Sequence, residues 1–384
     1  MKHIIRIVVV TLAIMLIVYG CTYTSITTSL NHTSATLTKH GEYEAILPLQ
    51  TCGDYFIADV MLNGFGPFPM MLDSGMGVTT ISPHVVGKTG VKRRINTIEI
   101  GDFLATGRIP CRVKSLDDIS RALGLDIEGI LGHGVFKGVL LTYDYPQMEV
   151  RVREGMLNDD EPGVVPTSKG KRPFIAAHID GRDITILADT GSSRGLTLID
   201  LDQYRFVVEP RFTGARVRIN GVSIVRTGRL DSVMTLGPLK LNEPLINNSV
   251  SVNLLGQDIL RNFAITFDQV QHRMKFASMQ DIDDEHGTKS IADVIEFPSL
   301  YGSGIIMIPD GDQYVIHDVA AHSPADEAGL RVGDVILAID GIRIDDRGCD
   351  HFNQRDDIPA SVTYVVQRDG ETHEVMITTT VIVP

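Results

Sequence analysis

The sequence contains no tryptophan, only four cysteines and no excess of basic residues. Its 384 residues include 48 acidic and 35 basic side chains, and the net charge of −13 argues against a nucleic-acid partner. No zinc-ligand motif, phosphate-binding loop or Ser-His nucleophile motif is present. The chain is nevertheless long enough for two or three domains with cores of their own. The chemistry expected of this chain therefore needs neither a metal ion nor an organic cofactor.

The N-terminus has the order of a secretory signal. Basic residues precede an apolar run over residues 7–18, which is short for a helix that spans a membrane. The Val-Tyr-Gly-Cys sequence at residues 18–21 resembles a bacterial lipobox, which implies that Cys21 carries a lipid and becomes the mature N-terminus. We therefore expect a lipoprotein of the cell envelope, anchored to a membrane and facing the periplasm or the exterior. A plain secreted protein and an uncleaved anchor are the alternatives.

Two short segments share a pattern in which an apolar run is followed by Asp, a small hydroxyl residue and Gly. The segments read Met-Met-Leu-Asp-Ser-Gly at residues 70–75 and Ile-Leu-Ala-Asp-Thr-Gly at residues 186–191. A carboxylate directly after an apolar run is costly unless the protein stabilises or uses it. One such triplet also describes an ordinary turn after a strand. Two of them point to a functional pair, Asp73 and Asp189.

The two triplets lie in corresponding places of a long internal repeat. Each is preceded by a strand-turn pattern, at residues 56–64 and 174–181, that is typical of a hairpin delivering the Asp. Each is followed by an apolar segment that ends in glycine, at residues 129–132 and 253–256. The repeat is too long for a solenoid unit. We interpret it as two homologous β lobes, each contributing one Asp to a shared site.

The doubled triplet with its hydrophobic-hydrophobic-Gly segment resembles the aspartic proteases, and among them a single-chain, two-lobed form of the bacterial retropepsin-like proteins. The resemblance covers about residues 54–277. It implies a mainly β fold with two homologous closed β-barrel lobes. It departs from the family where Met76 replaces a small residue, and the first lobe lacks the long hairpin that closes over the cleft in pepsin-like enzymes. The implied catalytic residues and their supporting loop residues are Asp73 and Asp189, with Ser74, Gly75, Thr190 and Gly191.

Two carboxylates held close together cannot both ionise easily, so the pair shares one proton. The ionised member then acts as general base on a water molecule, and the protonated member donates to the scissile carbonyl oxygen. The sequence does not distinguish the two roles. We expect Ser74 and Thr190 to join the triplets by hydrogen bonds across the lobes, and Gly75 and Gly191 to allow the turns. Gly132 and Gly256 are expected to let the backbone pass beneath each catalytic loop.

The second lobe contains an additional strand pair, at residues 216–219 and 222–226, around an Asn-Gly turn that predicts a hairpin. The hairpin is either part of the lobe body or a flap that covers the cleft and grips an extended peptide. Both interpretations are kept open.

Three cysteines follow the proposed lipidation site. Cys52 and Cys111 both lie in the first lobe and can pair in an oxidising compartment, although the sequence does not show them to be close. Cys349 has no His or second Cys at metal-ligand spacing, so it is interpreted as having no role.

The C-terminal region has its own signature, at residues 323–330 and 332–341. It resembles a bacterial PDZ domain, with a Pro-started helix that ends at Gly, then a turn, a strand and an Asp-Gly turn. The resemblance implies a domain that binds a peptide tail by adding it as a strand, while the N–H groups of a loop hold the tail's carboxylate. The residues expected to form this peptide-binding loop and the start of its strand are Tyr301, Gly302, Ser303, Gly304 and Ile305.

These patterns predict a membrane-anchored aspartic endopeptidase that acts on a peptide or protein substrate, with a PDZ domain that recruits or regulates that substrate. A non-catalytic peptide-binding scaffold is the alternative, and a protease dedicated to one envelope protein is a third reading. The expected segments are a signal peptide (1–21), a tether (22–41), a first lobe (42–153), a linker (154–171), a second lobe (172–277), an acidic linker (278–293) and a PDZ domain (294–384).

Overall fold

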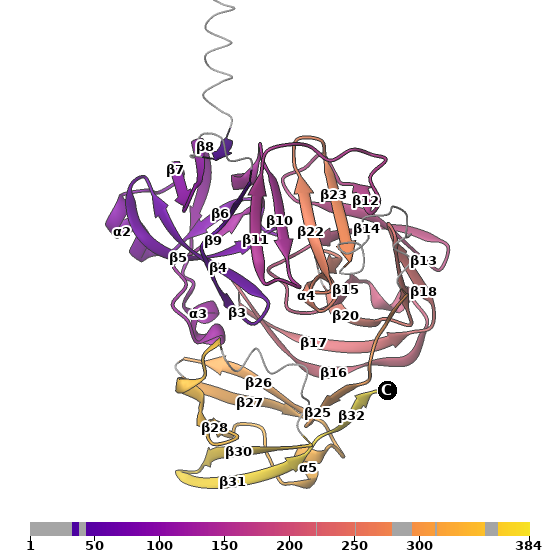
Figure 1. Ribbon diagram of the computed structural model, residues 1–384. Helices are drawn as coiled ribbons and strands as arrows, with labels where there is room; N and C mark the ends of the chain where they lie inside the picture. The colour runs from indigo at the N-terminus through magenta and orange to yellow at the C-terminus, as the bar shows by residue number, and fades with distance from the viewer. Residues whose placement is uncertain are drawn as a thin grey trace, which may run out of the picture.

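The protein is mainly β, with two lobes side by side and a smaller C-terminal domain beside them (Figure 1). The expected signal peptide with Cys21, residues 22–32 and 38–41 of the expected tether, and most of the acidic linker lie outside the described residues. The described part of the tether includes a strand, Ser34–Leu37, that pairs with the first lobe. Within the part of the chain that is described, no helix is long and apolar enough to cross a membrane. The computed structural model describes residues 33–37, 44–219, 221–249, 251–278, 294–311, 313–349 and 360–384.

The first lobe is a closed barrel, as the sequence predicts. Its elements are β1 (Ser34–Leu37), β3 (Leu49–Cys52), β4 (Tyr55–Leu62), β5 (Phe65–Asp73), β6 (Thr79–Ile81), α2 (Pro83–Thr89), β7 (Arg94–Ile100), β8 (Phe103–Val113), α3 (Asp117–Leu123), β9 (Gly129–Gly132) and η1 (His133–Phe136). The ring closes because β8 pairs with β7 along one edge and with β6 along the other. β9 lies between β5 and β6, and β7 returns to β4.

The second lobe is an open, curled sheet, so the prediction of two closed barrels is correct for one lobe only. Its elements are β13 (Phe174–Ile179), β14 (Arg182–Ala188), β15 (Leu196–Ile199), η2 (Leu201–Gln203), β16 (Phe206–Arg218), β17 (Gly221–Leu230), β18 (Val233–Leu236), β19 (Leu239–Asn242), β20 (Leu245–Ser249), β21 (Leu254–Leu255) and α4 (Gln257–Leu260). In the first lobe the single strand β8 closes the ring, but two separate strands take its position in the second lobe. They are β19, which pairs with β18, and β20, which pairs with β15. Glu243 has a φ of 40° and Pro244 lacks an N–H, so the strand breaks between them.

A six-stranded sheet joins the lobes. Its strands are β2 (Glu44–Ile46), β10 (Leu140–Asp144), β11 (Glu149–Arg153), β12 (Val164–Pro166), β22 (Phe263–Asp268) and β23 (Arg273–Ser278). The central pair, β10 and β22, comes from opposite lobes, and the Thr142 and Thr266 hydroxyls are 2.8 Å apart across it. β12 comes from the segment that the sequence suggests is a linker.

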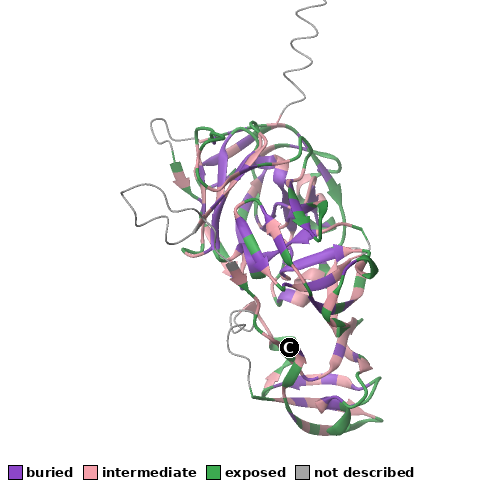
Figure 2. Cartoon of the chain, turned by 90° about the vertical axis from the view of Figure 1, so that its right-hand side faces the viewer, coloured by how far each residue is buried: buried purple, intermediate pink, exposed green. Residues whose placement is uncertain are grey.

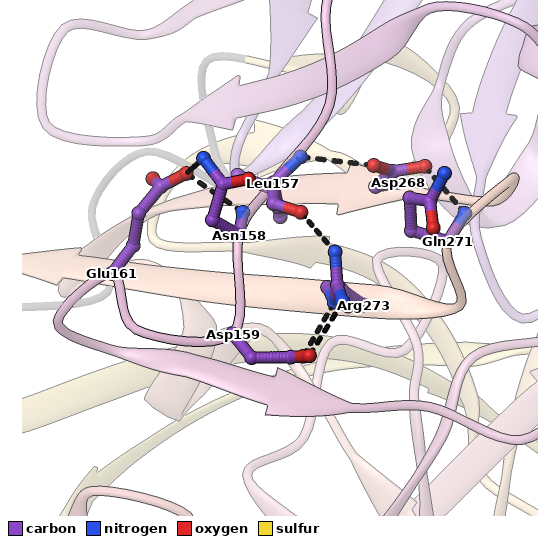
Figure 3. A network of polar contacts seen from close by, with 7 residues as sticks. All are labelled: Leu157, Asn158, Asp159, Glu161, Asp268, Gln271 and Arg273. Carbon is purple, nitrogen blue, oxygen red and sulfur yellow. Dashed lines mark hydrogen bonds and ion pairs between the residues drawn. The ribbon is translucent and has the colours of Figure 1, made fainter.

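The segment before β12 is held firmly, as Figure 3 shows. The Arg273 guanidinium donates two hydrogen bonds of 2.6 Å to the Asp159 carboxylate, and the Leu157 N–H donates to Asp268 at 3.0 Å. This part of the expected linker is therefore an ordered piece of the body that unites the lobes.

The C-terminal domain is a separate small sheet with a core of its own. Its elements are β26 (Ile305–Asp310), β27 (Gln313–Val319), α5 (Pro324–Glu327), β28 (Val335–Ile339), β29 (Ile342–Arg343), η4 (Ile344–Asp346), β30 (Ser361–Arg368) and β31 (Glu371–Thr378). Pro324 starts α5 and Ser323 caps it by accepting the Asp326 N–H at 3.3 Å, as the sequence signature predicts. Figure 2 shows fewer buried residues here than in the two lobes.

Three contacts fix the C-terminal domain to the lobes. The first is the parallel addition of β24 (Val294–Glu296) to β19 of the second lobe. Within the C-terminal region itself, β25 (Leu300–Gly302) pairs with the last strand, β32 (Thr380–Val383). The Arg229 guanidinium, only 9% exposed, donates hydrogen bonds to the carbonyl oxygens of Glu243, Phe297, Pro298 and the terminal Pro384.

The third contact is a disulfide between Cys52 of β3 and Cys349. Cys52 and Cys111, which the sequence allowed to pair, are therefore not joined, and the interpretation of Cys349 as a residue without a role is wrong. Cys111 is a free, buried thiol on β8, and burial raises its pKa to about 11. The disulfide links the first lobe to the PDZ region, 297 residues away in sequence.

We expect a Cys52→Ser/Cys349→Ser double variant to lose about 2–5 kcal/mol of unfolding free energy, because the cross-link restricts the unfolded chain. Urea unfolding of the oxidised protein and the variant measures the loss. Cys111→Ser is the matched control, and it should keep the cross-link. Mass spectrometry of unreduced peptides that found Cys52 joined to Cys111 would contradict the assignment.

Candidate active site

Asp73 and Asp189 occupy equivalent positions in the two lobes. Asp73 ends β5 and Asp189 directly follows β14. Each of these strands runs parallel to the short strand that carries the apolar-Gly segment, with Asp73 opposite Gly132 and Ala188 opposite Leu255. The same parallel pairing occurs in both lobes, so the two aspartates have equivalent backbone surroundings.

The two triplets meet face to face and exchange hydrogen bonds. The Ser74 N–H donates to Thr190 Oγ1 at 2.9 Å, and the Thr190 N–H donates to Ser74 Oγ at 3.0 Å. Ser74 Oγ also donates to the carbonyl of Ala188 at 2.8 Å. All these groups are buried, so each bond satisfies a polar atom that has no access to water. The exchange holds the two lobes in register at the site.

Each aspartate lies against the glycine of the opposite triplet. A Cβ on Gly191 would lie 2.5 Å from Asp73 Oδ2, and a Cβ on Gly75 would lie 2.7 Å from Asp189 Oδ2. Neither glycine has a positive φ. Glycine is therefore required at both positions because the opposite carboxyl group approaches closely. A sharp turn, which the sequence suggested as the reason, does not require it.

The glycines after the apolar segments are needed for a similar reason. A Cβ on Gly132 would lie 2.9 Å from the carbonyl oxygen of Met76, and one on Gly256 would lie 2.6 Å from that of Ser192. The backbone that follows each catalytic loop passes directly over these positions.

The pKa of Asp73 is raised well above its usual range, first by burial and then by the charge of Asp189 and the hydrogen bond between the two carboxyl groups. The N–H groups of Gly75 and Met76 donate to Asp73 Oδ1 at 2.7 and 3.2 Å and oppose that rise. A carboxyl group with a raised pKa keeps its proton at a pH where an exposed one has lost it. The surroundings of Asp73 therefore favour its protonated form.

The surroundings of Asp189 favour the ionised form more than those of Asp73 do. Burial also raises the pKa of Asp189, but the hydrogen bond with Asp73, the Gly191 N–H and the positive charges of Arg216 and Arg172 lower it. Both arginines belong to the second lobe, so the cations that favour an ionised Asp189 come from its own lobe.

Replacing Arg172 with Gln should move the acidic limb of the pH–activity profile to higher pH, by up to about one unit. Loss of the cation raises the pKa of Asp189, and a general base must be ionised to act. Rates measured from pH 3 to 8 show the shift. Lys169→Gln, an exposed change in the same segment, is the control and should leave the limb in place. An unchanged limb in the Arg172 variant would show that this charge does not act on the pair.

The hairpin of β16 and β17 reaches from the second lobe to the first. Its base pairs with β20, in the body of the lobe. Ile219, next to its tip, packs in a cluster with Met76 and with side chains of α3 in the first lobe. The base of the hairpin is therefore part of the sheet of its own lobe, and its tip lies against the opposite lobe (Figure 1).

Gln257 is a structural partner of the site that the sequence reading missed. Its side-chain amide donates to the Thr190 carbonyl at 2.7 Å and to the Asp54 carbonyl at 3.1 Å, so it ties one catalytic loop to the other lobe. The residue directly after the apolar-Gly segment differs between the halves, Gln257 in one and His133 in the other. That asymmetry was the available signal.

The expected PDZ loop residues do not share one environment. Gly302 and Gly304 line a cavity of about 390 Å³ together with Arg211 and Phe212 of β16. Ser303 is buried, with its hydroxyl 3.2 Å from that of Tyr364. Tyr301 is exposed on β25, and Ile305 begins β26, the first strand of its sheet. No group of His, Cys, Asp and Glu side chains among the described residues is arranged to hold a metal ion.

Comparison with known proteins identifies parts of the chain. The PDZ domain family matches residues 315–352, so the chain contains a PDZ domain near its C-terminus. No curated protein matches the sequence.

Among solved structures, a retropepsin-like aspartic protease from Rickettsia conorii is 17% identical over 29% of this chain and 94% of its own, with a TM-score of 0.24. A PDZ domain protein from Parabacteroides distasonis is 18% identical over 22% of this chain and 21% of its own, with a TM-score of 0.20. The PDZ domain of EpsC from Vibrio cholerae is 22% identical over 19% of this chain and 74% of its own, with a TM-score of 0.17.

Proposed function

We propose that the protein is an aspartic endopeptidase that hydrolyses peptide bonds with a water molecule activated by Asp73 and Asp189. The observation that carries the proposal is the reciprocal packing of the two aspartates, each against the opposite glycine, with a hydrogen bond between their carboxyl groups. A binding scaffold has no use for such a pair, because bringing two buried carboxyl groups together is costly.

In the proposed reaction Asp189 takes a proton from the attacking water, because its environment favours the ionised form. Asp73 donates its proton to the scissile carbonyl oxygen as the tetrahedral intermediate forms. Asp189 then gives the proton that it took from water to the nitrogen of the departing amine, and Asp73 takes a proton back from a hydroxyl of the intermediate. The C–N bond breaks, the new carboxyl group forms, and the pair regains its starting state. The hydrogen bonds of Ser74 and Thr190 keep the groups aligned throughout.

The β16–β17 hairpin is proposed to act as the flap of this enzyme. The hairpin starts in the second lobe, and Ile219 near its tip packs against the first lobe, which supports its role as a cover over the site. A peptide would enter the site when the tip lifts. The PDZ domain is proposed to bind a peptide tail along β26 and to regulate the flap, since Arg211 and Phe212 at the base of the hairpin line the same cavity as Gly302 and Gly304.

The site of action is proposed to be the cell envelope, with the protein held by a lipid on Cys21. The Cys52–Cys349 disulfide is consistent with an oxidising compartment. Metabolic labelling with a radioactive fatty acid, compared between the full chain and a Cys21→Ala variant, tests the anchor.

Incubation of the protein with an unfolded protein substrate between pH 4 and 6, with and without a statine inhibitor, tests the proposed reaction. We expect internal cleavage that the inhibitor blocks. Because a dedicated protease can ignore generic substrates, the incubation should include peptides from envelope proteins. Absence of cleavage from all of them would contradict the proposal.

A further inference from the structure

The hairpin carries positive charge toward the catalytic pair. Gly214, Arg216 and Arg218 alternate along β16, and the register with β17 is regular from Gly214 to Arg218, so their side chains share one face. Arg216 on this face is close enough to influence the charge of Asp189. This face of the flap therefore looks onto the dyad.

A third arginine comes from the catalytic loop itself. A Cβ on Gly214 would lie 3.6 Å from Nη2 of Arg194, so the Arg194 guanidinium fills the place beside Arg216 where a side chain at position 214 would lie. Burial, and then the positive charges of Arg218 and Arg194, lower the pKa of Arg216 to about 10. Arg194 and Arg218 thus lie close enough to Arg216 for their charges to act on it, in a chain whose net charge is −13.

The Arg216 guanidinium is not satisfied by the protein. Its Nη2 donates to Thr197 Oγ1 at 3.3 Å, but within the described chain its Nη1 is buried without a hydrogen-bond partner. A buried donor without a partner destabilises the fold, and more so when it is charged. A guanidinium is shaped to bind a carboxylate with two parallel hydrogen bonds. Asp189, the nearby carboxylate, is engaged with Asp73.

We propose that Arg216, assisted by Arg194 and Arg218, is the specificity determinant of the cleft and binds an acidic side chain of the substrate close to the scissile bond. The inference rests on the proposed peptidase function and names its substrate class, polypeptides with Asp or Glu beside the cleaved bond. Such a side chain reaches Nη1 when the substrate enters beneath the hairpin.

The first test is the cleavage pattern of a peptide pool at pH 6, where Asp and Glu side chains of substrates are ionised. Mass spectrometry should show acidic residues enriched within two positions of the cut. A matched pair of peptides with Glu or Gln at the enriched position should then differ by about tenfold or more in kcat/KM, mostly through KM.

Variants of Arg216 test whether this residue causes the preference for an acidic side chain. Arg216→Gln should remove the preference for Glu, and Arg216→Glu should favour a Lys peptide. Arg226→Gln on β17 is the control and should keep the preference, since its exposed guanidinium packs over Phe212 and bonds to the Pro210 carbonyl. Equal slowing of the Glu and Gln peptides by Arg216→Gln would show that Arg216 acts on the dyad alone, and it would overturn the inference.

Peptide binding measured by fluorescence anisotropy distinguishes failure of this inference from failure of the peptidase proposal. A protein that cuts nothing but binds the Glu peptide through Arg216 keeps the acid recognition and loses the proposed reaction. Cleavage without an acidic preference leaves the reaction standing and overturns the recognition. A protein that neither cleaves peptides nor binds the Glu peptide preferentially would overturn both the recognition and the proposed reaction.

Discussion

Replacing Asp73 with asparagine is expected to abolish peptide hydrolysis while making the folded protein at least as stable at neutral pH. Asparagine keeps the shape of the side chain and can still accept the Gly75 and Met76 N–H groups. It cannot donate a shared proton as an acid, and loss of general acid–base catalysis costs about 10²–10⁴ in rate. Asp189→Asn should have the same effect on rate, because it removes the base. Initial rates on a cleaved peptide measure both losses.

The stability of the Asp73 variant follows from the raised pKa. In the folded protein Asp73 keeps its proton above the pH at which the unfolded chain loses it. The unfolded state therefore binds fewer protons, and stability falls as pH rises from the ordinary pKa of Asp to the raised value. Asp73→Asn removes this term, so its advantage over the wild type should be largest at neutral pH and absent near pH 3. Thermal unfolding across that range measures it.

Asp59→Asn is the matched control for the dyad variants, because Asp59 is an exposed side chain on β4, earlier in the same hairpin. It should retain full activity. Cleavage by an Asp73 or Asp189 variant at more than about one per cent of the wild-type rate would contradict the shared-proton mechanism.

The sequence was informative where function depends on local pattern. The doubled triplets and the apolar-Gly segments identified the residues that meet at the site, and the PDZ signature identified α5 with its Ser323 cap. The hairpin could be predicted for the same reason, since an Asn-Gly turn between alternating strands is a short-range signal. Local chemistry determines each of these features within a few residues.

Features that depend on distant contacts could not be predicted. The Cys52–Cys349 disulfide joins positions 297 residues apart, and only the placement of the PDZ region against the first lobe makes it possible. The open second lobe depends on the break at Glu243, which the alternation of β strands does not reveal. Arg216 reads in sequence as a polar position of a hairpin, and its role depends on which face of β16 turns toward Asp189.

Gly191→Ala offers the sharpest test of the geometry, because one methyl group should inactivate the enzyme. The new Cβ would lie 2.5 Å from Asp73 Oδ2, so the carboxyl group must move, and a displacement of about 1 Å can cost 10²-fold in rate. Backbone strain does not contribute, because φ at Gly191 is not positive. Gly87→Ala is the control, since nothing lies within 4 Å of that position in α2, and alanine there should stabilise the helix.

The cause of the Gly191→Ala defect can be isolated by a double-mutant cycle with Asp73→Ala. If the methyl group acts through the Asp73 carboxyl, it should destabilise the wild type by about 1–3 kcal/mol and the Asp73→Ala background by clearly less. Chemical unfolding of the four proteins measures this coupling. Equal costs in both backgrounds would place the collision elsewhere. Full activity of Gly191→Ala would mean that the two triplets are farther apart in solution than the reciprocal packing requires, and the shared proton would then have no path between the carboxyl groups.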